Sequence, residues 1–334
     1  MAALSTMDGD LALRFDREPD YFALNRLAGS DWRVGVVDGD NGPLGCLAVA
    51  CRDAYVDGSP CSIAYVGDLK VHPSFRRQGV ARALGQWAYA TAQDLAGPAA
   101  PMMSTVLAGN EAAANLALGF LPGVTRSATI RSASVDLLTR HRPRRADRAL
   151  GLDVRLAEPA DEPEMLQLWR RSAIRRQFAP VLTGFSLQEP GLDYQLARRP
   201  GGALAGFVGL WDQHDIKQMR VMGYSARLAA VRVAFNLAAP LFGAPRLPRP
   251  GGALSYRTAV HVCALDSATL HALLRYACEH LHGRYSFLTV GLDIRDPLAR
   301  ALTGLRAQPA DVDVLVLNGP SDRSAPVHFE IATV

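Results

Sequence analysis

The chain divides into two stretches in which hydrophobic and polar positions predict the same order of elements. In the first stretch, apolar and β-branched runs at 42–54 and 59–71 flank an Asp-Gly pair and predict an antiparallel hairpin. Apolar residues then recur at helical spacing over 76–95, which predicts a helix directly after the second strand. The remaining predicted elements are a strand at 102–107, a helix at 110–118 and strands across 124–138. This alternation predicts parallel pairing through right-handed crossovers beside antiparallel strands.

The second stretch repeats this order without obvious sequence identity. Its predicted elements are strands at 154–156, 203–221, 258–265, 285–291, 312–317 and 327–334, and helices at 162–176, 267–281 and 297–305. Charged residues and a proline between Arg140 and Arg148 separate the two stretches. We therefore predict an α/β protein with mixed sheets, with a first domain at 1–140, a basic linker at 141–150 and a second domain at 151–334. A solvated linker is the preferred interpretation of the basic run, and a phosphate grip is the alternative.

Composition narrows the class of protein. The 334 residues are 49% hydrophobic and 20% charged, which is typical of a soluble globular protein. We find no signal peptide and no run near the ~20 apolar residues of a spanning helix, so we expect a cytoplasmic protein with no membrane partner. A net charge of +4 is weak ground for a nucleic-acid partner. Only Lys70 and Lys217 are lysines among 36 basic residues, a bias that indicates a GC-rich and therefore, we expect, bacterial genome.

Metal and disulfide chemistry find little support in the sequence. The five cysteines are odd in number and are never spaced as C-x-x-C, so no disulfide framework and no thiolate zinc site is predicted. Four histidines in the second stretch are interpreted as helix-surface residues and not as metal ligands: His261, His271, His280 and His282.

The turn between the strand at 59–71 and the following helix is a candidate anion site. It reads Arg76-Arg77-Gln78-Gly79-Val80-Ala81 and follows a strand end and Pro73. The N–H groups of a first helical turn have no intrahelical acceptors, and the helix dipole places partial positive charge there. The small residues Gly79 and Ala81 let phosphate oxygens approach the backbone. Neither a Walker A loop nor a G-x-G-x-x-G fingerprint is present, so a pyrophosphate held mainly by backbone amides is predicted.

This turn resembles the acetyl-coenzyme A signature of the GCN5-related N-acetyltransferases (GNAT superfamily). That signature is [QR]-x-x-G-x-[GA], and Arg76, Gly79 and Ala81 stand at its defining positions. The resemblance implies a tandem acyl-CoA N-acyltransferase fold with an active first domain, and an acetyl-CoA-dependent transfer to the amine of a small molecule or protein. The cofactor-binding residues that it implies are Leu69, Lys70, Val71, Arg76, Arg77, Gln78, Gly79, Val80, Ala81 and Asn110.

The resemblance also implies a catalytic strand end. The Leu69 amide is expected to donate to the thioester oxygen as it becomes an oxyanion. Asp68 is the candidate proton acceptor, with a capping or salt-bridged carboxylate as the alternative. Relatives often carry a tyrosine in the helix before Gly119, where this chain has Ala117, so the general acid stays unassigned.

The second stretch departs further from the family. Its corresponding turn begins at Asp266, which would repel a pyrophosphate, so we predict a degenerate domain that binds no coenzyme A. A cluster in this stretch contacts either a cationic acceptor or only solvent: Trp211, Asp212, His214 and Asp215. The apolar run 228–242 covers the acceptor cleft, packs against a second subunit as a possible homodimer, or belongs to the core. Two further alternatives stay open: another acyl donor such as succinyl-CoA, and a non-catalytic module that senses acetyl-CoA or binds a protein.

Overall fold

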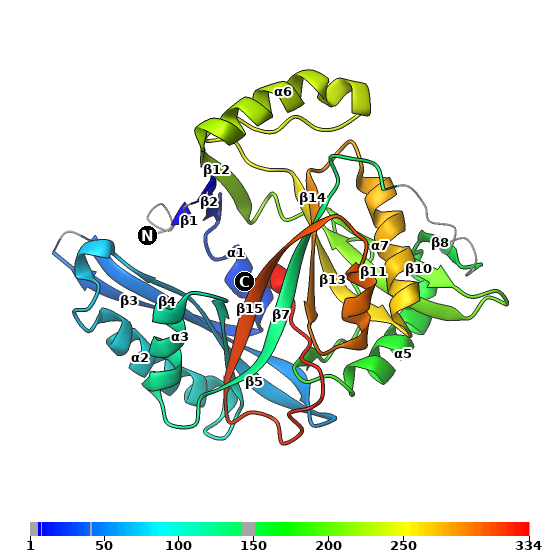
Figure 1. Cartoon of the computed structure of the whole chain (residues 1–334). Coiled ribbons are helices and arrows are strands. Elements are labelled where there is room, and N and C mark those ends of the chain that lie inside the picture. The colour runs from blue at the N-terminus through cyan, green and yellow to red at the C-terminus, as the bar shows by residue number, and fades with distance from the viewer. Residues whose placement is uncertain (1–5, 8, 41, 142–150, 334) are drawn as a thin grey trace.

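One mixed sheet of 12 strands runs through both halves of the chain (Figure 1). The computed structural model describes residues 6, 7, 9–40, 42–141 and 151–333. Along the sheet the strand order is β3-β4-β5-β6-β15-β7-β14-β13-β11-β10-β8, and β9 pairs with β4. The strands of the first half are β1 (Thr6–Met7), β2 (Leu11–Asp16), β3 (Asp31–Gly39), β4 (Gly42–Val56), β5 (Ser59–Val71), β6 (Met102–Leu107) and β7 (Thr125–Asp136). Those of the second half are β8 (Asp153–Leu156), β9 (Ala179–Pro180), β10 (Leu192–Arg198), β11 (Leu204–Trp211), β12 (Gln218–Tyr224), β13 (Tyr256–Ala264), β14 (Phe287–Asp293) and β15 (Ala307–Leu317).

Helices cover the sheet on both faces. The α-helices are α1 (Ala23–Ala28), α2 (Val80–Ala96), α3 (Glu111–Phe120), α5 (Glu162–Ala173), α6 (Ala226–Phe242) and α7 (Ser267–Leu281). Short 3₁₀ helices are η2 (Pro73–Phe75), η3 (Pro159–Asp161), η4 (Pro297–Leu302) and η5 (Ile331–Thr333). On β4, Leu47 and Val49 pack under α2, whereas Ala48 and Ala50 face the side where α1 lies. Side chains alternate between the faces of a strand, so α1 and α2 cover opposite faces of the first half.

The predicted mixed α/β architecture is confirmed, and so are most of its elements. The hairpin becomes β4 and β5, and the two predicted crossovers give the parallel pairs β5–β6 and β13–β14. The predicted helix at 297–305 is the 3₁₀ helix η4, which begins at Pro297 and ends at Leu302. The predicted closing strand at 327–334 is wrong. Within 327–333 the segment forms one isolated bridge, at Val327, and no ladder. It ends in the 3₁₀ helix η5.

The two halves exchange strands at the centre of the sheet. Strand β15 of the second half lies between β6 and β7, and β7 of the first half lies between β15 and β14, with every one of these pairs antiparallel. In addition, β2 near the N-terminus pairs with β12 of the second half in a separate three-stranded sheet. The division into domains at 1–140 and 151–334 stays a prediction, and linker residues 142–150 lie outside the described part of the chain.

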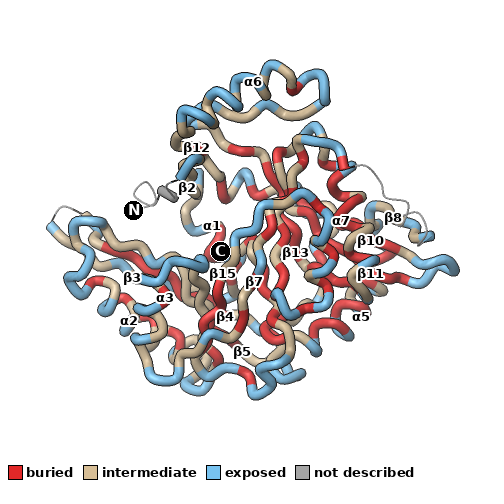
Figure 2. The backbone as a smooth tube through the Cα atoms, viewed as in Figure 1, coloured by how far each residue is buried: buried red, intermediate tan, exposed pale blue. Residues whose placement is uncertain are grey.

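The hydrophobic cores reflect this exchange. One cluster at the centre combines Ile63 and Met103 with Val314, Val316 and Phe329, so residues from both halves bury one another. Figure 2 shows that buried backbone is concentrated in the central strands and in α5 and α7. The structure therefore shares part of its core between the halves.

Helix α6 stands apart from this body. In Figure 1 it projects beyond β12, and Figure 2 shows it almost free of buried backbone. Leu237 is 79% exposed and Leu241 is 83% exposed, while Ala239 is its only fully covered residue among those described. The alternative that assigned 228–242 to the core is therefore wrong. None of the described helices is both long and apolar enough to cross a membrane.

Candidate functional site

A cleft opens where the parallel strands β5 and β6 diverge. They pair only from Ala64 to Val66, opposite Met102 to Ser104, and beyond this point the ladder between them ends. The space that results has a volume of about 440 Å³ and is bounded by both strands, α2 and α3. Of the predicted site residues, Asp68, Leu69, Lys70, Ala81 and Asn110 line this cleft.

A bulge interrupts β5 at the mouth of the cleft. On β4, Ala48 pairs with Gly67 and Cys46 pairs with Lys70. Asp68 and Leu69 together therefore face one residue, Leu47. Asp68 has a φ of +60°, a backbone conformation that residues other than glycine adopt at a free-energy penalty. Because two residues oppose one, the bulge turns the strand and changes the direction of its side chains.

The predicted phosphate turn leads from β5 into α2. Arg77 and Gly79 both have positive φ values, +61° and +85°, and a Cβ added at Gly79 would meet no atom within 4 Å. The Ala83 amide makes the first bond of the helix with the Gly79 carbonyl at 3.0 Å, so the preceding amides of the first turn have no acceptor within the helix. Open space, free amides and the exposed Arg76 and Arg77 together fit a diphosphate.

Four other predicted residues have structural roles here. Val80 is the first residue of α2 and is buried against the sheet. Gln78 donates to the Ser74 carbonyl at 3.0 Å, and the Asn110 side chain caps α3 by accepting from the Ala113 amide at 3.2 Å. Val71 ends β5 and packs beside the core under α2. Their contacts with a cofactor stay predictions.

Asp68 is held in an ion pair, as the alternative interpretation of the sequence had it. Arg17 donates to both carboxylate oxygens, at 2.5 and 2.6 Å, and the Lys70 ammonium lies 3.6 Å away. Lys70 also donates to the Tyr21 hydroxyl at 3.1 Å, and the Tyr21 ring lies 5.3 Å from both the Arg17 and the Lys70 charge. This pairing fixes the orientation of the Asp68 carboxylate at the mouth of the cleft. The role of Asp68 as proton acceptor stays a prediction.

The second half adds a buried cation to this site. Lys217 lies just before β12, and its ammonium is 4.8 Å from the centre of the Phe15 ring. Burial lowers the pKa of Lys217 to about 8, and the charges of Arg17 and Lys70 act in the same direction, whereas that of Asp68 opposes them. The Lys217 ammonium therefore interacts electrostatically with Arg17, Asp68 and Lys70.

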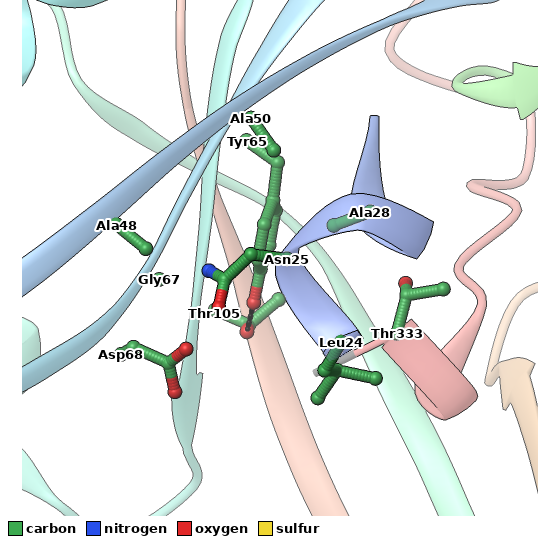
Figure 3. Close-up of a pocket in the computed structure, with 10 residues that line it drawn as sticks. All are labelled: Leu24, Asn25, Ala28, Ala48, Ala50, Tyr65, Gly67, Asp68, Thr105 and Thr333. Carbon is green, nitrogen blue, oxygen red and sulfur yellow. Dashed lines mark hydrogen bonds between the residues drawn. The ribbon is translucent and has the colours of Figure 1, made fainter. Parts of the chain in front are cut away.

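A smaller pocket lies on the other side of Gly67 and Asp68. Its volume is about 200 Å³, and it shares Gly67, Asp68 and Thr105 with the cleft. Figure 3 shows its other lining groups, which come from α1, from β4 and β5, and from the C-terminal segment: Leu24, Asn25, Ala28, Ala48, Ala50, Tyr65 and Thr333. The Tyr65 hydroxyl and the Thr105 hydroxyl are hydrogen-bonded at 2.9 Å.

Sequence reasoning missed Arg17, Asn25, Tyr65, Thr105 and Lys217. Arg17 and Asn25 precede the motif by many residues, and Lys217 comes from the other half of the chain. Nothing in the local pattern marks them, because only the fold brings them to the bulge. The alternation of β5 places Tyr65 and Gly67 on one face, and this is the single signal that could have linked Tyr65 to the site.

The same backbone arrangement recurs in the second half. Strand β13 pairs in parallel with β14 only from Tyr256 to Thr258, and its ladder with β11 is irregular opposite Val208. His261 has a φ of +50° at this bulge, which makes it the counterpart of Asp68. The prediction that His261 lies on a helix surface is therefore wrong: it is on β13.

The C-terminal segment occupies the space beside this second bulge. Glu330 accepts from the His261 amide at 2.9 Å and contacts the His328 ring nitrogen at 2.7 Å. Ile331 lies so close to Gly291 that a Cβ there would come within 2.6 Å of it. The turn before α7 is also used internally, since Asp266 caps the helix by accepting from the Thr269 amide at 2.7 Å.

Three of the remaining predicted groups, Asp212, His271 and His282, have structural partners. Asp212 accepts from the Tyr285 hydroxyl at 2.7 Å, and the His271 ring contacts the Ala301 carbonyl at 2.7 Å. The His282 ring contacts the Leu137 carbonyl at 2.8 Å. Within the described residues no group of three or more His, Cys, Asp or Glu side chains is placed to hold a metal ion.

Comparisons with known proteins identify a family model that matches part of the chain. The family model described as Acetyltransferase (GNAT) domain matches residues 30–118, which include β5, the phosphate turn and α2. This match identifies a GNAT domain in the first half of the chain. No curated protein sequence matches the chain.

Solved structures also align with the chain at low sequence identity. Saccharomyces cerevisiae N-myristoyltransferase with bound myristoyl-CoA aligns with a TM-score of 0.57 and 11% identity over 92% of this chain and 75% of its own. A GCN5-related N-acetyltransferase from Anabaena variabilis aligns at a TM-score of 0.49 and 12% identity, over 90% of this chain and 66% of its own. One from Kribbella flavida gives a TM-score of 0.45 and 15% identity, over 85% and 60%. This chain thus spans about two thirds of the Anabaena protein.

Proposed function

We propose that the protein is an acetyl-CoA-dependent N-acetyltransferase whose first half carries the active site. The observation that supports this best is the cleft between β5 and β6, which runs from Ala81, in the first turn of α2 next to the open phosphate turn, to the bulge at Asp68. In this proposal the diphosphate lies on the first turn of α2 and the pantetheine arm lies along β5. The thioester then reaches Leu69.

The acetyl group is favoured over longer acyl groups by the space beyond the bulge. The pocket on that side has a volume of about 200 Å³ and must also admit the acceptor. Its lining includes the polar groups of Asn25, Asp68, Tyr65 and Thr105, and a long alkyl chain could not satisfy the Asn25 oxygen, which has no hydrogen-bond partner among the described residues. A short acyl group leaves room for an amine to approach the thioester carbon.

The transfer itself requires few groups. The amine nitrogen attacks the thioester carbon, a C–N bond replaces the C–S bond, and one proton passes from the amine to solvent or a base while the thiolate gains one. We assign the Leu69 amide to the oxyanion, because the bulge frees this part of β5 from regular pairing. Lys70 lines the cleft, and in this proposal its ammonium provides positive charge for the departing thiolate.

Thiol release from an acyl-CoA series tests this function. Acetyl-, succinyl-, octanoyl- and myristoyl-CoA are each mixed with a panel of primary amines, and free thiol is followed with a chromogenic disulfide. We expect amine-dependent release that is fastest with acetyl-CoA. Faster release with myristoyl-CoA would overturn the acetyl assignment, and tight binding of every donor without release would favour the non-catalytic module.

A further inference from the structure

An unsatisfied hydrogen-bond acceptor lies inside the pocket next to the bulge. Asn25 is 5% exposed, and its Oδ1 has no hydrogen-bond partner among the described residues. Figure 3 shows the Asn25 amide leaving α1 and pointing into the space between Asp68 and the Tyr65 ring. A buried acceptor without a partner is destabilising, and such groups are uncommon in folded proteins. Rotation of the Asn25 amide by 180° exchanges its oxygen and nitrogen, and the oxygen then accepts a hydrogen bond from a ligand in the pocket.

The other polar groups of the pocket define what that ligand carries. The lining contains one carboxylate, that of Asp68, and no cationic side chain among its ten residues. Tyr65 is a neutral hydroxyl, because burial raises its pKa, and it is already hydrogen-bonded to Thr105. Two acceptors that face one space are complementary to a group with several N–H donors, which is the property of a primary amine.

The rest of the lining defines the body of the ligand. Leu24 and Ala28 of α1 face Ala48 and Ala50 of β4, so the walls are apolar and their side chains are small. A cavity of roughly 150 Å³ accommodates benzene, and this one has a volume of about 200 Å³. The space therefore fits a compact hydrocarbon body attached to one amino group.

Two other kinds of amine fit less well. A polyamine brings a second ammonium, and the lining contains no second carboxylate to pair with it. An amino acid brings a carboxylate, which would lie near the Asp68 carboxylate and the Asn25 oxygen with no cation in the lining to balance it.

We propose that Asn25 is a specificity-determining residue of an acceptor pocket for small primary monoamines with an apolar body, such as benzylamine. This inference rests on the proposed acetyl transfer, because the pocket and the cleft meet at Gly67, Asp68 and Thr105. The amine nitrogen donates to Asn25 Oδ1, and the hydrocarbon body lies against the alanines of β4.

A comparison of acceptors on the wild-type protein is the first test. With acetyl-CoA as donor, kcat/KM is measured for benzylamine, n-butylamine, spermidine, glycine and a lysine-containing peptide. We expect benzylamine and n-butylamine to exceed the other three at least tenfold. A preference for spermidine, glycine or the peptide would overturn the pocket assignment and leave the acetyltransferase function intact.

Two variants then test the pocket itself. Asn25→Leu retains the size of the side chain and removes the acceptor, so we expect KM for benzylamine to rise about tenfold or more while the Kd for acetyl-CoA stays unchanged. Ala50→Val leaves Asn25 intact and narrows the pocket, so benzylamine should lose more affinity than n-butylamine. Equal KM values for wild type and a folded Asn25→Leu would overturn the proposal.

A binding measurement separates failure of the pocket from failure of the enzyme. Calorimetry with benzylamine is carried out on the wild type and both variants in the presence of saturating coenzyme A. If no amine is acetylated but benzylamine binds in an Asn25-dependent way, the pocket stands and the transferase proposal is overturned. If transfer occurs to other amines and benzylamine does not bind, the pocket assignment is overturned.

Discussion

The two halves of the chain build the same bulge on corresponding strands and use it differently. At Asp68 the bulge borders a cleft of about 440 Å³, whereas at His261 the space beside the strand is filled by the C-terminal segment. Both bulges carry a positive φ next to a parallel pair of only three residues. The backbone therefore provides the geometry in each half, and what occupies the space beside it decides whether a site exists.

The turn after β5 is open to a ligand, whereas the corresponding turn after β13 is closed by its own residues. In the first half it is open at Gly79, and in the second half Asp266 accepts from the first turn of α7. A carboxylate in that position supplies the negative charge that a phosphate would otherwise bring. The second half has thus satisfied internally the groups that the first half leaves available to a ligand.

The largest expected effect tests this difference at Gly79. Gly79→Asp places a carboxylate where the diphosphate is proposed to lie, and like charges at ~4 Å repel by about 4 kcal/mol at an effective dielectric of 20. We expect the Kd for acetyl-CoA, measured by calorimetry, to rise roughly 10³-fold.

Asp266→Asn is the matched control in the second half. It removes the charge but retains the cap, so binding should stay at one acetyl-CoA per chain. Unchanged affinity in a folded Gly79→Asp protein, or two sites per chain in Asp266→Asn, would contradict the assignment of the cofactor to the first half.

The next effect concerns Glu330, which fills the second bulge. Burial opposes its ionisation, but the charge and hydrogen bond of His328, with His261, outweigh burial and lower the pKa of Glu330 to about 2. Glu330→Gln should reduce the free energy of unfolding by about 3 kcal/mol in denaturant titrations near neutral pH. Because the folded-state pKa lies below the ordinary value, this stabilisation is present above pH ~4.5 and disappears as the pH falls toward 2.

Acetyl-CoA binding is the control for Glu330→Gln. The carboxylate lies in the second half and outside both the cleft and the acceptor pocket, so the Kd should stay within about twofold of wild type. A loss of binding without a loss of stability would mean that the filled half takes part in cofactor recognition.

A third effect sharpens the role of Asp68. Asp68→Asn should lower turnover about 10²-fold if the carboxylate accepts the amine proton, and the deficit should shrink as rising pH deprotonates the amine without help. Arg17→Met separates this role from the ion pair, because it retains the base and removes its partner. If Arg17→Met reproduces the whole deficit with the same pH profile, the contribution of Asp68 is the orientation of the site.

The smallest expected effect concerns Lys217, which the second half contributes to the first. Its folded-state pKa of about 8 lies below the ordinary value of 10.5, so below pH 8 the folded protein carries the full penalty of a buried charge. Lys217→Met keeps the aliphatic stem and should raise the free energy of unfolding by about 1–3 kcal/mol at pH 7. The gain should shrink between pH 8 and 10.5, because the folded wild type loses its proton first and its stability rises relative to the variant. A gain independent of pH would show that packing, not charge, decides the effect.

Local patterns predicted much of the fold but only part of the site. The helical spacing after Val71 and the turn at Gly79 are short-range features, so α2 and its open first turn could be predicted from the sequence. The exchange of β7 and β15 could not, because either strand satisfies its alternation against several neighbours. Arg17 and Asn25 were missed for a related reason: their function depends on tertiary contacts with the bulge.

The C-terminal segment shows the same limit. Residues 327–333 alternate in a way that predicts a strand, yet Val327 forms only a single bridge, with Gln177, and Glu330 turns inward to His261. A buried carboxylate in an apolar run is the one signal that could have indicated a filled cavity, since such a group requires a buried partner.

The central strand exchange also bears on how the chain is made. During synthesis β6 and β7 emerge long before β15, which begins at Ala307 and separates them in the finished sheet. Until then both strands have unpaired edges, and such edges promote association with other chains. Nearly the whole polypeptide must therefore be synthesised before the first half can complete its sheet. A chain that ends at residue 300 lacks β15, so we expect it to aggregate despite an intact cofactor motif.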